Sequence, residues 1–130
     1  MLKNFDLRVY IIVISLFCNG IIQSQEKKVI EIKQAGSFDK NENVNPGANV
    51  LRKNKDTRVH LFHEGMNIYS DYALFYKASN SFKANGNVVV KQGDSITMIS
   101  ENLDYDGNKR KIIARGNVDF TNKETNLKTD

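Results

Sequence analysis

Two histidines followed by a glutamate are the residues of this sequence that most resemble a metal-binding string. His60, His63 and Glu64 carry imidazole and carboxylate groups, which are common zinc ligands. The residues around them alternate as in a β-strand, where positions three apart face opposite sides of the sheet. His60 and His63 would then face apart, so we predict neither a metal site nor a cofactor.

Recurring acidic residues could supply a pair of catalytic carboxylates. The candidates are Asp71, Glu101, Asp104 and Asp106, and a glycosidase that uses two carboxylates places them on either side of the bond it cleaves. These acids recur together with the apolar residues around them. A structural role at turns therefore explains them better than catalysis does.

Serine and glycine motifs likewise give no catalytic centre. Ser70, Ser79 and Ser95 stand outside any nucleophile-elbow sequence. Gly86 and Gly93 do not open a helical pattern, so a phosphate-binding loop is not indicated. We predict that the protein is not an enzyme and has no catalytic residues.

The N-terminus has the pattern of a secretory signal peptide. Lys3 and Arg8 precede an apolar run over residues 10–22, which is shorter than the roughly 20 apolar residues of a membrane-spanning helix. Ser24 offers a small residue for cleavage. Residues 1–24 are therefore predicted to be a signal peptide, and the protein to be exported.

The composition fits one exported, folded domain. The chain has 130 residues, of which 40% are hydrophobic and 26% charged, and a net charge of +4. This mild excess favours anionic partners such as phospholipid or lipid A phosphates. Tyr69 and Tyr72 near Lys77 could stack on nucleic acid, but export argues against that partner. Cys18, the single cysteine, lacks the small preceding residues of a lipobox.

Short alternating runs dominate the chain from residue 58 onward. Apolar residues spaced two apart define them: Val59 and Leu61, Met66 and Ile68, Val88 and Val90, Ile96 and Met98, Val118 and Phe120. This period is typical of half-buried strands, and glycine-based turn signals separate the runs. The sequence predicts an all-β domain, preceded over residues 25–57 by a lead-in strand and a polar loop.

The same region repeats itself after about 30 residues. Asp71 falls on Glu101, and Gly86-Asn87-Val88 falls on Gly116-Asn117-Val118. Self-similarity at a fixed interval is typical of stacked architectures. A third copy starts at Gly116 and is unfinished at Asp130, so we expect the repeats to be truncated at the C-terminal end. An open edge of this kind favours pairing with another chain.

The order of these motifs resembles the OstA-like, or organic-solvent-tolerance, family. The resemblance covers residues 58–130 and rests on Ala84-Asn85-Gly86-Asn87-Val88, Gln92-Gly93-Asp94, Leu103-Asp104-Tyr105-Asp106, Ala114-Arg115-Gly116-Asn117-Val118 and Leu127-Lys128-Thr129-Asp130. This family is related to the periplasmic bridge protein of lipopolysaccharide transport. It is also related to the N-terminal domain of the outer-membrane lipopolysaccharide translocon.

The resemblance implies an open, twisted β-jelly roll with the shape of a V-shaped trough. Its inner face would bind acyl chains of lipopolysaccharide or lipid A during transport to, and assembly in, the outer membrane. The inner-face residues would be Val59, Leu61, Ile68, Phe75, Phe82, Val88, Val90, Ile96, Met98, Leu103, Tyr105, Ile112, Val118 and Phe120. The resemblance places the protein in the periplasm or on the periplasmic face of the outer membrane.

The resemblance also implies two kinds of protein partner, and one alternative stays open. The partners would be other β-trough proteins of the transport bridge, joined end to end by strand pairing, and components of the inner or outer membrane. Alternatively, the apolar residues form only a closed core, which any domain of this size needs. The protein would then be a structural β-solenoid, acting as a scaffold or interaction module of the cell envelope.

Overall fold

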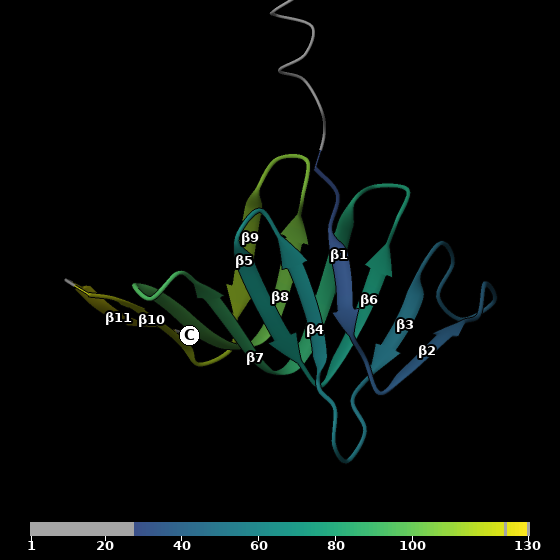
Figure 1. The fold of residues 1–130 in the computed structure, drawn as a ribbon, viewed down its shortest axis with the longest axis horizontal. Helices are drawn as coiled ribbons and strands as arrows, with labels where there is room; N and C mark the ends of the chain where they lie inside the picture. Colours follow the sequence, from purple (N-terminus) through teal and green to yellow (C-terminus); the bar gives the residue numbers. More distant parts are fainter. Residues whose placement is uncertain (1–27, 124, 130) are drawn as a thin grey trace, which may run out of the picture.

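The computed structural model describes residues 28–123 and 125–129, and these form eleven strands of one curled antiparallel sheet (Figure 1). The predicted signal peptide, residues 1–24, and Asp130 lie outside the described residues. The described chain contains no helix that is long and apolar enough to cross a membrane. The strands are β1 (Glu31–Gln34), β2 (Ser37–Lys40), β3 (Asn49–Arg52), β4 (Val59–His63), β5 (Met66–Ser70), β6 (Tyr72–Tyr76), β7 (Ser81–Gln92), β8 (Ile96–Asp106), β9 (Lys111–Arg115), β10 (Val118–Asn122) and β11 (Thr125–Thr129).

Two long strands, β7 and β8, join the two limbs of this sheet. Along one edge of β7, β6 pairs with residues 81–85 and β5 pairs with residues 89–92. Along the outer edge of β8, β10 pairs with residues 96–99 and β9 with residues 102–106. One limb is therefore β1-β4-β5-β7-β8-β10-β11, and the other is β2-β3-β6-β7-β8-β9. We call them the β4 limb and the β6 limb.

The prediction of an all-β, open jelly-roll trough is confirmed. The limbs form the two walls of the trough, and the corner between them is where β7 and β8 pass from one wall to the other (Figure 1). The tips of the β4–β5, β6–β7 and β8–β9 hairpins lie on the side away from the corner, at the top of Figure 1. We call this side the mouth of the trough.

Glycine–asparagine pairs form the corner. Gly86 and Asn87 have φ values of 83° and 46°, and Gly116 and Asn117 have 83° and 47°. Two successive positive φ values interrupt the regular pleat, and the pairing of β7 with β8 shifts register between Asn85 and Val88. Glycine adopts this conformation freely, and asparagine tolerates it better than most other residues. The chain therefore changes direction at both pairs, within β7 at the first and between β9 and β10 at the second.

An acidic residue covers the glycine at the first corner. The Asp71 N–H donates to Gly86 O at 3.0 Å, and Asn87 Nδ2 donates to Asp71 Oδ2 at 2.9 Å. Burial alone would raise the pKa of the Asp71 carboxyl. The hydrogen bond from Asn87 and the positive charges of Lys53 and Arg58 outweigh burial, so the pKa of Asp71 lies below its ordinary value. Asp71 thus ties three neighbouring strands together at the bend.

The second corner has the same construction. The Glu101 N–H donates to Gly116 O at 2.9 Å, and Asn117 Nδ2 donates to Glu101 Oε1 at 2.6 Å. Ser70 and Ser100 precede the two acids, and each hydroxyl donates to the backbone carbonyl two residues further on. The acids and serines considered as catalytic candidates at positions 70, 71 and 101 therefore contribute to the bend of the sheet.

Residues 25–57 contain more strands than the sequence indicated. Besides β1, this segment contributes β2 and β3, which extend the β6 limb. Leu51 is fully buried and belongs to the core. Alternation did not reveal these strands because Val50 and Leu51 are adjacent apolar residues and Phe38 stands alone in β2. The trough is therefore longer than residues 58–130 alone would make it.

Candidate binding trough

Three rows of mostly apolar side chains cross the strands on the inner faces of the limbs. Paired positions in the β4 limb form the row Ile32, Leu61, Ile68, Val90, Met98, Phe120 and Leu127. Paired positions in the β6 limb form two rows, which are Phe38, Leu51, Ala73, Ala84, Leu103 and Ala114, and Asn49, Phe75, Phe82, Tyr105 and Ile112. Each row runs from a strand at one end of the trough to a strand at the other.

In the middle of the trough these rows pack against each other. Leu61 and Leu103 are 0% exposed, and Ile68 and Phe82 are 1% exposed. Residues of both limbs belong to one buried cluster. Burying one side chain of this size contributes roughly 1.5–3 kcal/mol to stability, so this stretch is the hydrophobic core of the domain.

Toward both ends of the trough the same rows become exposed. At the C-terminal end Ile112 is 36% exposed and Leu127 is 59% exposed, and at the N-terminal end Phe38 is 55% exposed. An apolar cavity of about 370 Å³ opens beside Phe38, and its lining includes Phe75 and Lys77. Its size falls within the range typical of ligand pockets. The inner face is thus closed in the middle and accessible at its ends.

The predicted inner-face residues divide along the same gradient. The buried cluster contains Val59, Leu61, Ile68, Phe75, Phe82, Val88, Val90, Leu103 and Tyr105, with Met98 packed against it. Val118 is also buried, Ile96 and Phe120 are half-buried, and Ile112 is exposed. Alternation could have identified two further members of the cluster, Ala73 and Ala84, because each stands two positions from a predicted phenylalanine.

Two polar side chains, from His63 and Tyr105, lie buried near the mouth. His63 Nδ1 is 2.5 Å from the Tyr105 hydroxyl, and His63 Nε2 is 3.1 Å from the Lys28 carbonyl oxygen. Because a carbonyl can only accept, Nε2 carries the hydrogen, and in the neutral imidazole Nδ1 then accepts from the Tyr105 hydroxyl. Burial raises the pKa of the Tyr105 phenol, and the negative charge of Glu64 adds to this effect. The phenol therefore keeps its proton at neutral pH.

The second histidine lies on the other face of β4. His60 stacks on Tyr69 with ring centroids 4.4 Å apart, and its Nε2 is 2.8 Å from Asn67 Oδ1. His60 and His63 therefore have separate partners. Within residues 28–123 and 125–129, histidine, cysteine and carboxylate side chains form no group of three or more that could hold a metal ion.

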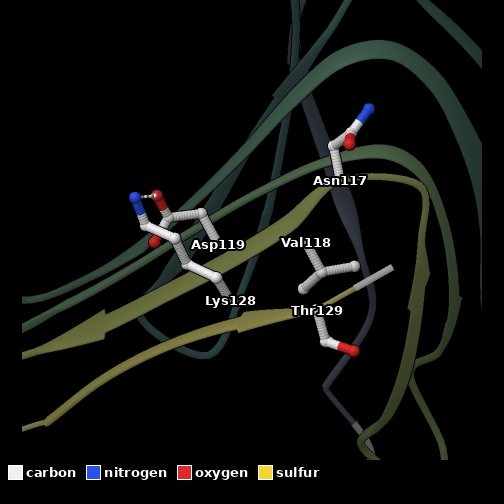
Figure 2. Close-up of a pocket in the computed structure, with 5 residues that line it drawn as sticks. All are labelled: Asn117, Val118, Asp119, Lys128 and Thr129. Carbon is white, nitrogen blue, oxygen red and sulfur yellow. Dashed lines mark ion pairs between the residues drawn. The ribbon is translucent and has the colours of Figure 1, made fainter.

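A second, polar cleft lies at the other end of the sheet, beside the paired strands β10 and β11 (Figure 2). It has a volume of about 510 Å³ and is lined by Asn117, Val118, Asp119, Lys128 and Thr129. Lys128 Nζ lies 3.8 Å from Asp119 Oδ2 across the cleft. Because its walls are mostly polar, this cleft does not extend the apolar inner face.

The fold defines the class of protein, which is an antiparallel β trough with an apolar inner face. The described residues of this trough contain no cluster of metal ligands. The chain belongs to the OstA-like protein family, whose model matches residues 25–130. No curated protein and no solved structure matches the chain. The family resemblance is thus confirmed, and the match includes β1, β2 and β3.

Membership of this family implies a role in lipopolysaccharide transport. The family is one of transport and binding proteins and is not known for enzymatic activity. Proteins of this family act in the periplasm, which suggests that this protein is exported.

Proposed function

We propose that this protein binds acyl chains of lipopolysaccharide or lipid A between its two limbs and hands them on without covalent chemistry. The observation that carries the proposal is the continuity of the three inner rows, which, apart from Asn49, stay mostly apolar from the core out to the exposed ends of the trough. Ile112, Phe38 and Leu127 continue these rows at exposed positions, where they add little to the core. Family membership supports the same function.

The physical basis of binding is burial of methylene groups. Each buried CH₂ group contributes about 0.8 kcal/mol. Burial of a short stretch of an acyl chain at an open end is therefore enough for reversible binding. The limbs remain open to water at their rims, which leaves room for the sugar part of an amphiphile. Lys77 at the rim of the apolar cavity favours a ligand with phosphate groups.

The ends and the middle of the trough differ in how accessible they are to an acyl chain. Leu61 and Leu103 already pack against other core residues, so a chain reaches them only when the limbs part. Ile112 and Phe120 are accessible without such a movement. End-to-end pairing with other β-trough proteins would align successive open ends into one apolar path, and inner- or outer-membrane components would deliver or receive the lipid.

A matched pair of substitutions tests this function. Ile112 faces the trough and pairs with buried Tyr105, whereas its neighbour Ile113 faces outward and has nearly the same exposure, 39% against 36%. Ile112→Asp is expected to weaken binding of fluorescently labelled lipopolysaccharide at least tenfold, and Ile113→Asp is expected to leave it unchanged. Circular dichroism checks that both variants fold. Equal binding by the two folded variants would rule out an inner-face site at the C-terminal end.

A structural β-solenoid scaffold is the second candidate function, and the closed middle of the trough favours it. Seven core side chains larger than alanine are exposed by 1% or less, and these are Leu51, Val59, Leu61, Ile68, Phe82, Val88 and Leu103. A scaffold would bind proteins by its edge strands and would not bind lipopolysaccharide. Absence of binding by the wild-type protein in the same assay would favour this function.

A further inference from the structure

The segment before β1 crosses the mouth of the trough. Residues 28–30 belong to no strand and lead into β1 of the β4 limb. Lys28 and Val29 are exposed, but Ile30 is only 4% exposed and belongs to the core cluster. A Cβ atom placed on Gly107, at the tip of the β8–β9 hairpin, would lie 3.1 Å from Ile30 Cδ1. The Ile30 side chain therefore reaches from one limb to the other.

Two buried polar side chains hold this segment in place. The Ile30 N–H donates to Asn80 Oδ1 at 2.8 Å, and Asn80 Nδ2 donates to Lys28 O at 3.1 Å. His63 Nε2 donates to the same carbonyl at 3.1 Å. His63 is 2% exposed and Asn80 is 9% exposed. Because burial of polar groups is unfavourable without hydrogen bonds, both side chains depend on the segment for part of their bonding.

The two holding residues come from different limbs. His63 ends β4, whereas Asn80 lies in the β6–β7 turn. The backbone of Asn80 is itself anchored, because the Gly107 N–H donates to Asn80 O at 2.8 Å. The segment thus connects the tips of three hairpins, and it adds to the His63–Tyr105 hydrogen bond and the Arg110–Glu64 ion pair, which join two of these tips.

Cavities lie beside the segment. Val29 and Ile30 line the apolar cavity of about 370 Å³. On the other flank Lys28 and His63 line a smaller cavity of about 110 Å³. Ile30 is therefore an apolar plug at the wall of the larger cavity, and its backbone N–H is held by Asn80.

We infer that residues 28–30 form a strap over the trough and that an acyl chain enters the mouth by displacing the Ile30 side chain. This inference rests on the proposed function and specifies where the ligand enters. The branched aliphatic side chain of Ile30 occupies the position that methylene groups of the ligand take when the strap opens. The strap and the ligand therefore compete for one apolar site.

Hydrogen exchange and probe binding together test the strap. Asn80→Gly removes the side chain that holds Ile30, and glycine readily adopts the positive φ of 48° at this position. Exchange of the Ile30 amide, monitored by NMR, is expected to accelerate about tenfold, the upper range for loss of one hydrogen bond. Amides of β7 and β8 should keep their protection. The same variant is expected to bind anthroyloxy-palmitate several-fold more tightly than the wild type.

Two further variants complete the experiment. Ile30→Ala shortens the plug but keeps the backbone bonds, and it should also raise the affinity for the probe. Ser79→Ala is the matched control, because the Ser79 side chain lies on the same turn and pairs with the Ser81 hydroxyl. Equal probe affinity in all proteins, despite faster Ile30 exchange in Asn80→Gly, would overturn the strap and leave the proposed function standing. Absence of probe binding in every protein would overturn both.

Discussion

The corner of the trough leads to a prediction about glycine substitutions, with a control inside the same chain. Gly86 and Gly65 have nearly the same φ value, 83° and 84°. A Cβ on Gly86 would lie 3.0 Å from Asp71 Cβ, whereas a Cβ on Gly65 would meet nothing within 4 Å. Alanine therefore meets the same unfavourable φ value at the two positions, and the contact with Asp71 arises only at Gly86.

The magnitude follows from two separate effects. Placing an L-residue at such a φ value costs roughly 1–2 kcal/mol at either position. At Gly86 the crowded contact adds about 1–3 kcal/mol, the usual effect of overpacking. Gly86→Ala is therefore expected to destabilise the domain by about 2–5 kcal/mol in total. Gly116→Ala should behave like Gly86→Ala, because its Cβ would lie 2.8 Å from Glu101 Cβ.

Urea unfolding followed by circular dichroism measures these differences. The free energy of unfolding should fall further for Gly86→Ala than for Gly65→Ala, with unchanged m-values. In thermal unfolding, each 1 kcal/mol corresponds to roughly 4–8 °C for a domain of this size. Equal losses for Gly65→Ala and Gly86→Ala would refute the argument that the acid packs tightly on the corner glycine.

Three further predictions concern stability and its pH dependence. Leu103→Ala should lower the free energy of unfolding by about 2–5 kcal/mol. Leu127 lies at an exposed position of another inner row, so Leu127→Ala should change the free energy of unfolding by less than about 0.5 kcal/mol. Urea titrations of both variants measure these changes. Because the folded pKa of Asp71 is lowered, its contribution is present above the unfolded pKa of about 3.9 and is lost as pH falls through the folded pKa. Urea titrations at successive pH values should therefore show a smaller acid-induced loss for Asp71→Asn than for the wild type. Because the folded pKa of Tyr105 is raised, the contribution of Tyr105 to stability is present below about pH 10 and is lost above it. Tyr105→Phe should remove this alkaline loss of stability. At neutral pH the same substitution should cost about 1–3 kcal/mol, because His63 Nδ1 loses its hydrogen-bond donor. Unfolding curves at neutral and alkaline pH would contradict this if the wild type and Tyr105→Phe coincide.

The sequence predicted the strands wherever apolar residues alternate. Val88 and Val90, for example, both face the core as the period of two indicated. Alternation failed where a bulge resets it. In β8, Ser100 and Leu103 are both buried although they are three positions apart, because the strand crosses the corner between them. Local periodicity cannot reveal such a shift, since it depends on the pairing with neighbouring strands.

The candidate site was predictable only in part, because exposure depends on position along the trough. Phe82 and Ile112 both face inward, yet one is 1% exposed and the other 36%. The difference arises because strands flank β7 on both edges, whereas β9 pairs with β8 alone among the described strands. The strap was not predictable for a related reason. His63 and Asn80 meet Lys28 only through contacts spanning 35 and 52 residues of chain.

Native mass spectrometry of the protein, purified gently from the cell envelope, shows whether the trough carries lipopolysaccharide or lipid A. We expect a bound species with the mass of lipid A or lipopolysaccharide that added phospholipid does not displace. A protein that is free of lipid, under conditions in which a known lipopolysaccharide carrier retains its cargo, would contradict the claim and leave the inner rows as the core of a scaffold.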